Sequence, residues 1–272
     1  MTEPSSPLVA RDITLGYGRS SIIDGLNVSI PAGSVTTIIG PNGCGKSTLL
    51  RGFGRLLRTR EGEILLHGAP IDGMRTRDIA RRVAILPQAP SAPEGLTVAE
   101  LVSRGRHPHQ SWARQWSSDD EAEIGAALAL TGMTHLAGRP IDELSGGQRQ
   151  RAWIAMTLAQ GTEILLLDEP TTYLDLAHAV DVLDLVDRLN DELGRTVLMV
   201  LHDLNLAARY SDRIIVMKEG RVVTVGTPQE TITVEMLREV FGLSATVMID
   251  DESGAPTVIP HSTRRATRIP VD

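Results

Sequence analysis

A glycine-rich segment near the start of the chain has residue types and spacing suited to binding phosphate. The pattern G-x-x-x-x-G-K-S runs from Gly40 to Ser47, after a β-branched stretch and before a helical one. Its glycines allow successive backbone N–H groups to point at phosphate oxygens, and the helix N-terminus adds a positive dipole. Lys46 supplies a compact charge to the β- and γ-phosphates, and Ser47 can coordinate Mg²⁺. The alternative is a glycine-rich turn with a surface lysine.

Two adjacent carboxylates follow an apolar stretch later in the chain. Residues 163–167 are predicted to form a buried strand, and Asp168 and Glu169 come directly after it. In a protein with a phosphate-binding loop, the first acid lies near the Mg²⁺ shell, and the second can polarise a water against the γ-phosphate. Simple solvation of the strand end is the alternative.

A second candidate phosphate-binding helix end lies at Leu144 to Gln148. Ser145 stands at the N-cap position of a helix predicted to run through Ala159, and two glycines after it permit close backbone approach. One γ-phosphate cannot require two separate helix ends in one monomer. The segment therefore predicts a contact with nucleotide bound to a partner subunit.

Net charge and scarce residue types limit the function classes. The net charge of −7 over 272 residues disfavours nucleic acid as a partner, because phosphate backbones need a basic face. The single cysteine, Cys44, excludes an intrachain disulfide and indicates a reducing compartment. We expect no targeting or spanning segment, since the apolar runs are far shorter than the roughly 20 residues that cross a bilayer.

Lysine is unusually rare in this chain. Lys46 and Lys218 are the two lysines among 27 basic residues. A base composition that favours arginine codons explains the shortage. A compact ammonium is nevertheless specifically useful at Lys46, because the planar fork of arginine differs in reach and shape.

Apolar patterning predicts strands that alternate with helices, which is typical of a parallel α/β core with a helical block inserted into it. Strands are expected at residues 8–15, 22–30, 35–39, 64–66, 79–86, 163–167, 196–201, 214–217 and 221–225. Helices are expected from about residue 46, at 118–130 and at 176–193, and Thr97 with Glu100 and Ser118 with Glu121 are predicted capping boxes. We expect residues 104–116 to form an exposed loop and residues 261–272 to be loose.

These motifs, in this order, resemble the ATP-binding subunits of ABC transporters over essentially residues 7–260. The resemblance implies a single ABC ATPase domain over 1–272 with a P-loop NTPase fold. Its RecA-like core with an N-terminal antiparallel β subdomain would take residues 7–87 and 161–245. An inserted α-helical subdomain with the signature motif would take 88–160, and a short C-terminal extension 246–272. The implied activity is ATP hydrolysis, with ATP and Mg²⁺ as cofactors.

The resemblance also assigns roles to individual residues. In the catalytic set Glu169 acts on water and His202 contacts the γ-phosphate, and the set is completed by Gln88, which senses the γ-phosphate, and by Lys46. The metal set is Ser47, Gln88 and Asp168. In the nucleotide-binding set Tyr17 stacks on adenine, and the other members are Gly40, Pro41, Asn42, Gly43, Cys44, Gly45, Lys46, Ser47, Thr48, Gln88, Ser145, Gly146, Gly147, Gln148, Asp175 and His202. No motif is degenerate, so both sites of a homodimer are expected to hydrolyse ATP.

Some of these residues have a plainer interpretation when taken alone. Tyr17 suits a strand edge, Gln88 a polar loop, and His202 a satisfied core position. Cys44 is explained as a small tolerated residue, whose alkylation would block the ATPase sterically.

Two further groups of residues invite a functional interpretation. The pair His107 and His109 fits a contact surface better than a metal site, since no acid lies nearby in the sequence. Three basic residues of the tail fit a solvated end better than a contact with anionic lipid: Arg264, Arg265 and Arg268.

Several longer stretches resemble one branch of the family, the ATPases of iron–siderophore importers of the ferric enterobactin type. They are residues 105–109, 144–159, 168–175, 201–205 and 248–260. This branch implies a homodimer at the cytoplasmic face of the inner membrane, a polytopic permease, and an extracytoplasmic siderophore-binding protein acting through it. Importers of vitamin B12 or haem are the alternatives, and a soluble ABC ATPase of iron–sulfur cluster assembly is another. No residue of the sequence indicates direct recognition of a siderophore.

Overall fold

The computed structural model describes residues 6–110 and 117–262, which form three sheets and the helices that cover them. The strands are β1 (Leu8–Tyr17), β2 (Ser20–Ile30), β3 (Val35–Ile39), β4 (Glu61–Leu66), β5 (Ala69–Pro70), β6 (Val83–Leu86), β7 (Ile164–Asp168), β8 (Thr196–Val200), β9 (Arg213–Lys218), β10 (Arg221–Gly226), β11 (Ala245–Ile249) and β12 (Pro256–Pro260). The α-helices are α1 (Lys46–Phe53), α2 (Thr76–Ala80), α3 (Val98–Ser103), α4 (Ser118–Leu130), α5 (Gly146–Ala159), α6 (Leu176–Leu193), α7 (Leu204–Arg209), α8 (Pro228–Thr231) and α9 (Val234–Phe241). Short 3₁₀ turns are η1 (Ile71–Gly73), η2 (Arg104–Arg106), η3 (Thr134–Leu136) and η4 (Ile141–Glu143).

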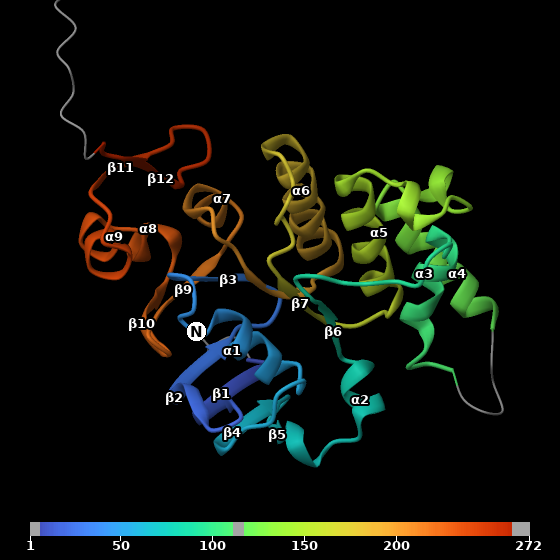
Figure 1. Ribbon diagram of the computed structural model, residues 1–272, viewed down its shortest axis with the longest axis horizontal. Coiled ribbons are helices and arrows are strands. Elements are labelled where there is room, and N and C mark those ends of the chain that lie inside the picture. The colour runs from blue at the N-terminus through green and yellow to red at the C-terminus, as the bar shows by residue number, and fades with distance from the viewer. Residues whose placement is uncertain (1–5, 111–116, 263–272) are drawn as a thin grey trace, which may run out of the picture.

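A six-stranded sheet with the order β10-β9-β3-β8-β7-β6 forms the centre of the molecule (Figure 1). Its neighbours from β9 to β6 run parallel, and β10 alone pairs antiparallel. Every residue of β3, β7 and β8 is buried, because helices and a second sheet cover both faces. Continuous β-branched and aliphatic stretches are typical of such strands. The predicted α/β fold with a parallel core is confirmed.

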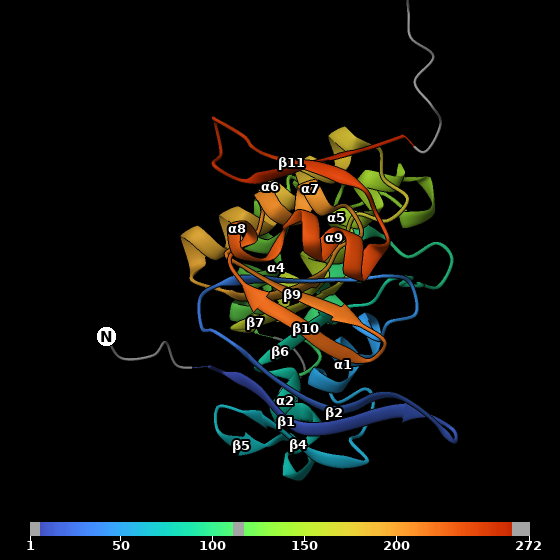
Figure 2. The same ribbon diagram turned by 90° about the vertical axis from the view of Figure 1, so that its left-hand side faces the viewer.

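The N-terminal strands form a separate antiparallel sheet with the order β2-β1-β4-β5. Figure 2 shows this sheet as the lowest layer, with α1 between it and the six-stranded sheet. Leu49, Leu50 and Phe53 of α1 are buried in the cluster that joins the two sheets. The helix after β3 is therefore fixed on both sides by apolar packing.

The chain between β6 and β7 supplies α3, α4 and α5, which lie together to one side of the core (Figure 1). A buried ion pair holds this block together, since Arg106 Nε donates to Asp120 Oδ1 at 2.8 Å. The Arg106 guanidinium also donates to the Ala159 carbonyl at the end of α5. One arginine thus connects the segment after α3 to both other helices.

The C-terminal hairpin of β11 and β12 packs on α7, at the top of the molecule in Figure 2. The side chain of Asn205, in α7, both accepts a hydrogen bond from the backbone of one strand residue and donates one to it. Its Oδ1 accepts from the Val258 N–H at 2.7 Å, and its Nδ2 donates to the Val258 carbonyl at 3.3 Å. The side-chain amide substitutes for a neighbouring strand and fixes the hairpin on the core.

Most predicted elements are confirmed, including the capping box of Thr97 with Glu100, but three expectations are wrong. The strand expected at 79–86 begins at Val83, and Ile79 lies in α2. The cap of α4 is Ser117 with Asp120 rather than Ser118 with Glu121. The expected exposed loop at 104–116 begins with η2, in which Arg106 is buried. Residues 111–116 lie outside the described ranges, as do the tail arginines 264, 265 and 268.

Candidate active site

The order of the parallel strands brings distant residues to one edge of the sheet. The phosphate-binding segment follows β3, His202 follows β8, Glu169 follows β7 and Gln88 follows β6. These four strands are consecutive neighbours and run parallel. Their carboxyl ends therefore meet at the same edge, which is where open α/β sheets bind ligands.

The glycine-rich segment closes tightly around a buried lysine. A side chain at Gly40 would lie 2.2 Å from the Met217 carbonyl, so only glycine fits where the loop leaves β3. Lys46, at the start of α1, is 5% exposed, and its ammonium donates to the carbonyls of Gly40 and Pro41 at 2.8 and 3.0 Å. Because neutral carbonyls leave a buried positive charge uncompensated, the site fits an anion such as a triphosphate.

Next to the lysine, the side chains of Ser47 and Asp168 bring two oxygen atoms together. Ser47 Oγ donates to Asp168 Oδ1 at 2.7 Å, and Asp168 is 2% exposed. Burial raises the pKa of Asp168, and the charge of Glu169 adds to this, although the hydrogen bond from Ser47 opposes it. A buried carboxylate beside a hydroxyl offers the hard oxygen atoms that Mg²⁺ prefers, so these residues fit Mg²⁺.

The carboxylate of Glu169 accepts hydrogen bonds from three side chains. Gln88 Nε2 and Thr172 Oγ1 donate to Oε2 at 2.6 and 2.9 Å. His202 Nε2 lies 2.6 Å from Oε1. Burial raises the pKa of Glu169, but the bonds from His202, Thr172 and Gln88 outweigh burial and hold that pKa below its ordinary value. Glu169 therefore stays ionised, as a group that orients or deprotonates water must be.

The backbone at Glu169 is held in an unusual conformation. Its φ of 54° lies in the left-handed region, which residues other than glycine rarely adopt. The Thr172 N–H donates to the Glu169 carbonyl at 3.2 Å and closes the turn. This turn directs the carboxylate toward Gln88 and His202 rather than along the strand.

These groups surround one open cavity of about 440 Å³. Nine of the nineteen predicted site residues line it, and they come from four separate stretches of sequence. The lining is formed by Ile22, Asn42, Gly43, Gly45, Lys46, Ser47, Thr48, Gln88, Glu169 and His202.

Other predicted site residues do not line this cavity. Tyr17 is 45% exposed, and its hydroxyl accepts a hydrogen bond from Arg51 at 3.2 Å. Ser145 is the N-cap of α5 in a capping box with Gln148, as its sequence position predicts. Asp175 is the N-cap of α6. The capped helix ends at Ser145 and Asp175 are therefore not part of the cavity of their own chain.

Sequence reasoning missed two residues of the site. Thr172 carries no motif of its own, and its only sequence signal is a position three residues after Glu169. Ile22, at an apolar strand position, lines the cavity beside the phosphate-binding segment. His109 lies outside this site and contacts the backbone of the fold, since its Nε2 lies 2.8 Å from the Gln160 carbonyl.

The comparisons with known proteins decide the family. The family described as "ABC transporter" matches residues 23–172. The chain belongs to the ABC transporter family. The petrobactin import ATP-binding protein FpuD of Bacillus anthracis is 53% identical over 261 residues, which cover 96% of either chain. The ferric enterobactin transport ATP-binding protein FepC of Escherichia coli is 48% identical over 260 residues, again with 96% of both chains covered.

A solved structure agrees with the sequence relatives. An inward-facing putative metal-chelate type ABC transporter contains a chain with a TM-score of 0.82 and 28% identity, and the match covers 95% of this chain and 99% of that one. This protein is thus an ABC ATPase that binds ATP, and its fold is that of the P-loop NTPases. In the described part of the chain, no helix is both long enough and apolar enough to cross a bilayer.

Proposed function

We propose that this ABC ATPase is the ATP-hydrolysing subunit of an importer that takes up ferric siderophore across the cytoplasmic membrane. The observation that carries the hydrolytic part is the convergence of Lys46, Glu169 and His202 on one open cavity, whose lining residue Ser47 also contacts the buried Asp168. The names of relatives such as FpuD and FepC support the substrate class.

Each of these groups has a distinct role in the proposed reaction. Lys46 neutralises the β- and γ-phosphates, and the backbone N–H groups around Gly43 and Gly45 bind their oxygens. Ser47, Gln88 and Asp168 hold Mg²⁺, which neutralises charge on the phosphate oxygens when it is bound. Glu169 orients or deprotonates the attacking water, and His202 holds the γ-phosphate.

Two copies of the chain would bind two nucleotides head to tail. Each nucleotide would lie between the phosphate-binding segment of one chain and Ser145 to Gln148 of the other. Support comes from the capped N-terminus of α5, which does not line the cavity of its own chain. ATP then favours the closed pair because its charge is satisfied only between both chains, and hydrolysis reopens it.

A polytopic permease would dock beside Gln88 and the segment that follows α3. Two arginines of α2 and its end support this segment, because Arg77 and Arg81 both donate to the Pro108 carbonyl, at 2.8 and 2.9 Å. The ATPase would thereby be held at the cytoplasmic face of the inner membrane. An extracytoplasmic siderophore-binding protein would deliver the substrate to the permease.

Growth and uptake in a deletion strain test this function. The strain should fail to accumulate labelled ferric siderophore, the wild-type gene should restore uptake, and a Glu169→Gln gene should not. An Asp191→Asn gene is the matched control, since this exposed α6 carboxylate lies outside the site. Normal siderophore uptake in the deletion strain, with loss of vitamin B12 or haem uptake instead, would contradict the proposed substrate. Loss of iron–sulfur enzymes with purely soluble partners would contradict import altogether.

A further inference from the structure

The N-terminal turns of α5 and α6 pack against each other at a glycine. A β-carbon added to Gly147 would lie 2.6 Å from Cδ2 of His178 and 3.1 Å from its Cγ. Gly147 is buried and His178 is half-buried. The imidazole therefore occupies the space that a side chain on the signature segment would need.

The same imidazole also holds the start of α6. His178 Nδ1 lies 2.6 Å from Oδ1 of Asp175, and the His178 backbone N–H donates to that oxygen at 2.9 Å. The exposed turn before Asp175 contains Tyr173, whose φ of 66° lies in the left-handed region. One side chain thus touches both the turn after Glu169 and the signature segment.

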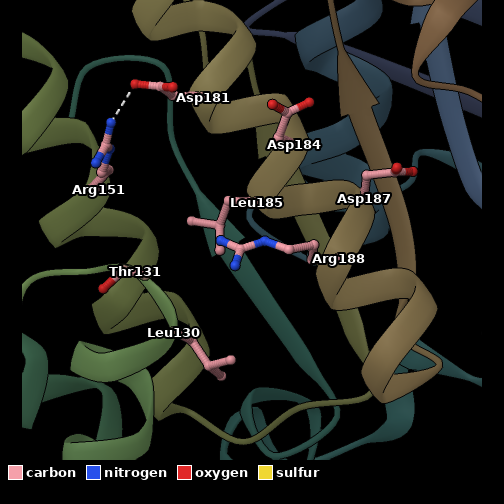
Figure 3. A pocket seen from close by; sticks show the side chains of 8 residues that line it. All are labelled: Leu130, Thr131, Arg151, Asp181, Asp184, Leu185, Asp187 and Arg188. Carbon is pink, nitrogen blue, oxygen red and sulfur yellow. Dashed lines mark hydrogen bonds and ion pairs between the residues drawn. The ribbon is translucent and has the colours of Figure 1, made fainter.

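One helical turn further on, a second contact joins the two helices. Arg151 Nη2 donates to Asp181 Oδ2 at 2.5 Å. Figure 3 shows this pair at one end of a cavity of about 510 Å³, which lies between α6, the C-terminal end of α4 and the N-terminal half of α5. Asp184 and Arg188 of α6 lie on the far side of that cavity from Leu130. Within the described chain, α5 and α6 therefore meet closely at their N-terminal turns and separate beyond them.

We propose that His178 is a positioning residue that couples the turn at Asp175 to the signature segment of the same chain. This inference rests on the proposed function, in which both segments face the partner copy and its nucleotide. When two copies close and move the turn, the imidazole carries the N-terminus of α5 with it. His178 touches no substrate, so its effect is on the alignment of Ser145 to Gln148.

Matched substitutions separate the two contacts of the imidazole. His178→Ala removes both and should lower the steady-state ATPase kcat about tenfold or more, as misalignment of distant groups does, with KM changed less than about twofold. His178→Asn should keep most of the activity, because asparagine places a donor where Nδ1 lies and an oxygen where Cδ2 lies. His135→Ala, at an exposed histidine of the helical block that carries the signature segment, is the control and should behave as wild type.

A second-site rescue provides the decisive measurement. Gly147→Ala alone should lower kcat about 100-fold, because the new methyl group pushes the imidazole away from Asp175. Combined with His178→Ala it should recover to the level of His178→Ala, whereas combined with His178→Asn it should not recover. A double variant Gly147→Ala/His178→Ala as inactive as Gly147→Ala would overturn the proposal, and so would wild-type kcat in His178→Ala.

The outcomes distinguish this inference from the proposed function. All rates are phosphate release by the full chain at saturating Mg·ATP, after thermal unfolding has shown that each variant is folded. If the wild-type chain hydrolyses ATP but the rescue pattern is absent, only the role of His178 fails. If the wild-type chain and Glu169→Gln hydrolyse ATP equally, the assignment of the active site fails.

Discussion

The buried ion pair between Arg106 and Asp120 should dominate the stability of the helical block. The side chains are 8% and 7% exposed, and their Nε and Oδ1 atoms are 2.8 Å apart. At an effective dielectric constant of about 20, this separation gives an attraction of about 6 kcal/mol, much of which desolvation offsets. Asp120→Asn keeps the volume but leaves the Arg106 cation buried without its partner. The expected loss is about 3–5 kcal/mol of unfolding free energy.

Urea unfolding followed by circular dichroism measures this loss, and thermal unfolding checks it. At about 2–4 °C per kcal/mol for a chain near this size, Asp120→Asn should lower Tm by roughly 6–20 °C. Glu94→Gln, at an exposed carboxylate, is the control and should change the unfolding free energy by less than about 0.5 kcal/mol. The double variant Arg106→Met/Asp120→Asn should be more stable than Asp120→Asn alone, because it has no buried, unpaired positive charge.

The loss of unfolding free energy in Asp120→Asn should depend on pH, and the pKa of Asp120 determines the direction. The hydrogen bond and charge of Arg106, with bonds from Ser117, hold the pKa of Asp120 below its ordinary value of 3.8 in spite of burial. A depressed pKa in the folded chain adds stability above the unfolded value, and this stability is lost as pH falls through the folded value. The difference between wild type and Asp120→Asn should therefore be the same at pH 7 and pH 5 and shrink only below about 3.8. A difference under about 1 kcal/mol at pH 7, or one that already shrinks between pH 7 and 5, would refute this reasoning.

Four shorter predictions concern other parts of the chain. Glu169→Gln should retain ATP binding while phosphate release falls by about 10²–10⁴-fold, and equal loss of binding would point to a structural defect. Lys46→Arg should weaken ATP binding at least about tenfold in titration calorimetry although it keeps the charge, because the guanidinium cannot replace a compact ammonium. Asn205→Leu should cost about 1–3 kcal/mol in urea unfolding, because the Val258 N–H and carbonyl lose their partner. Burial raises the pKa of Cys44, so iodoacetamide at pH 8 should modify the native chain at least about 100-fold more slowly than the urea-unfolded chain.

The sequence predicts the site well because its motifs are tied to strand ends. Once β3, β8, β7 and β6 are parallel neighbours, the residues that follow them must share one edge of the sheet. Sequence patterns mispredict a helix cap where two adjacent residues fit the same pattern and a tertiary contact selects one of them. Ser117 and Ser118 each have an acid three residues later, and Asp120 is chosen because Arg106 pairs with it.

Two further failures have the same origin. The apolar pattern at 79–86 gives no boundary, and the strand starts at Val83 because pairing with Ile164 of β7 starts there. The charged residues at 104–106 predicted the start of an exposed loop. Arg106 is instead buried, because it pairs with Asp120, fourteen residues later in the sequence. The second lysine also has a tertiary explanation, since Lys218 Nζ donates to the Glu239 carbonyl in α9 at 2.7 Å.

The hydrogen bonds around Glu169 carry a consequence for the order of events in the proposed reaction. Two of its three donors, Gln88 and His202, are the groups proposed to face the metal and the γ-phosphate. The His202 hydrogen that Glu169 accepts is the one that the γ-phosphate would need, so we expect nucleotide binding to weaken that bond. The freed lone pair of the carboxylate is then available to a water, while Thr172 keeps the carboxylate in place. We therefore expect nucleotide binding to exchange the His202 donor of the proposed general base for the attacking water.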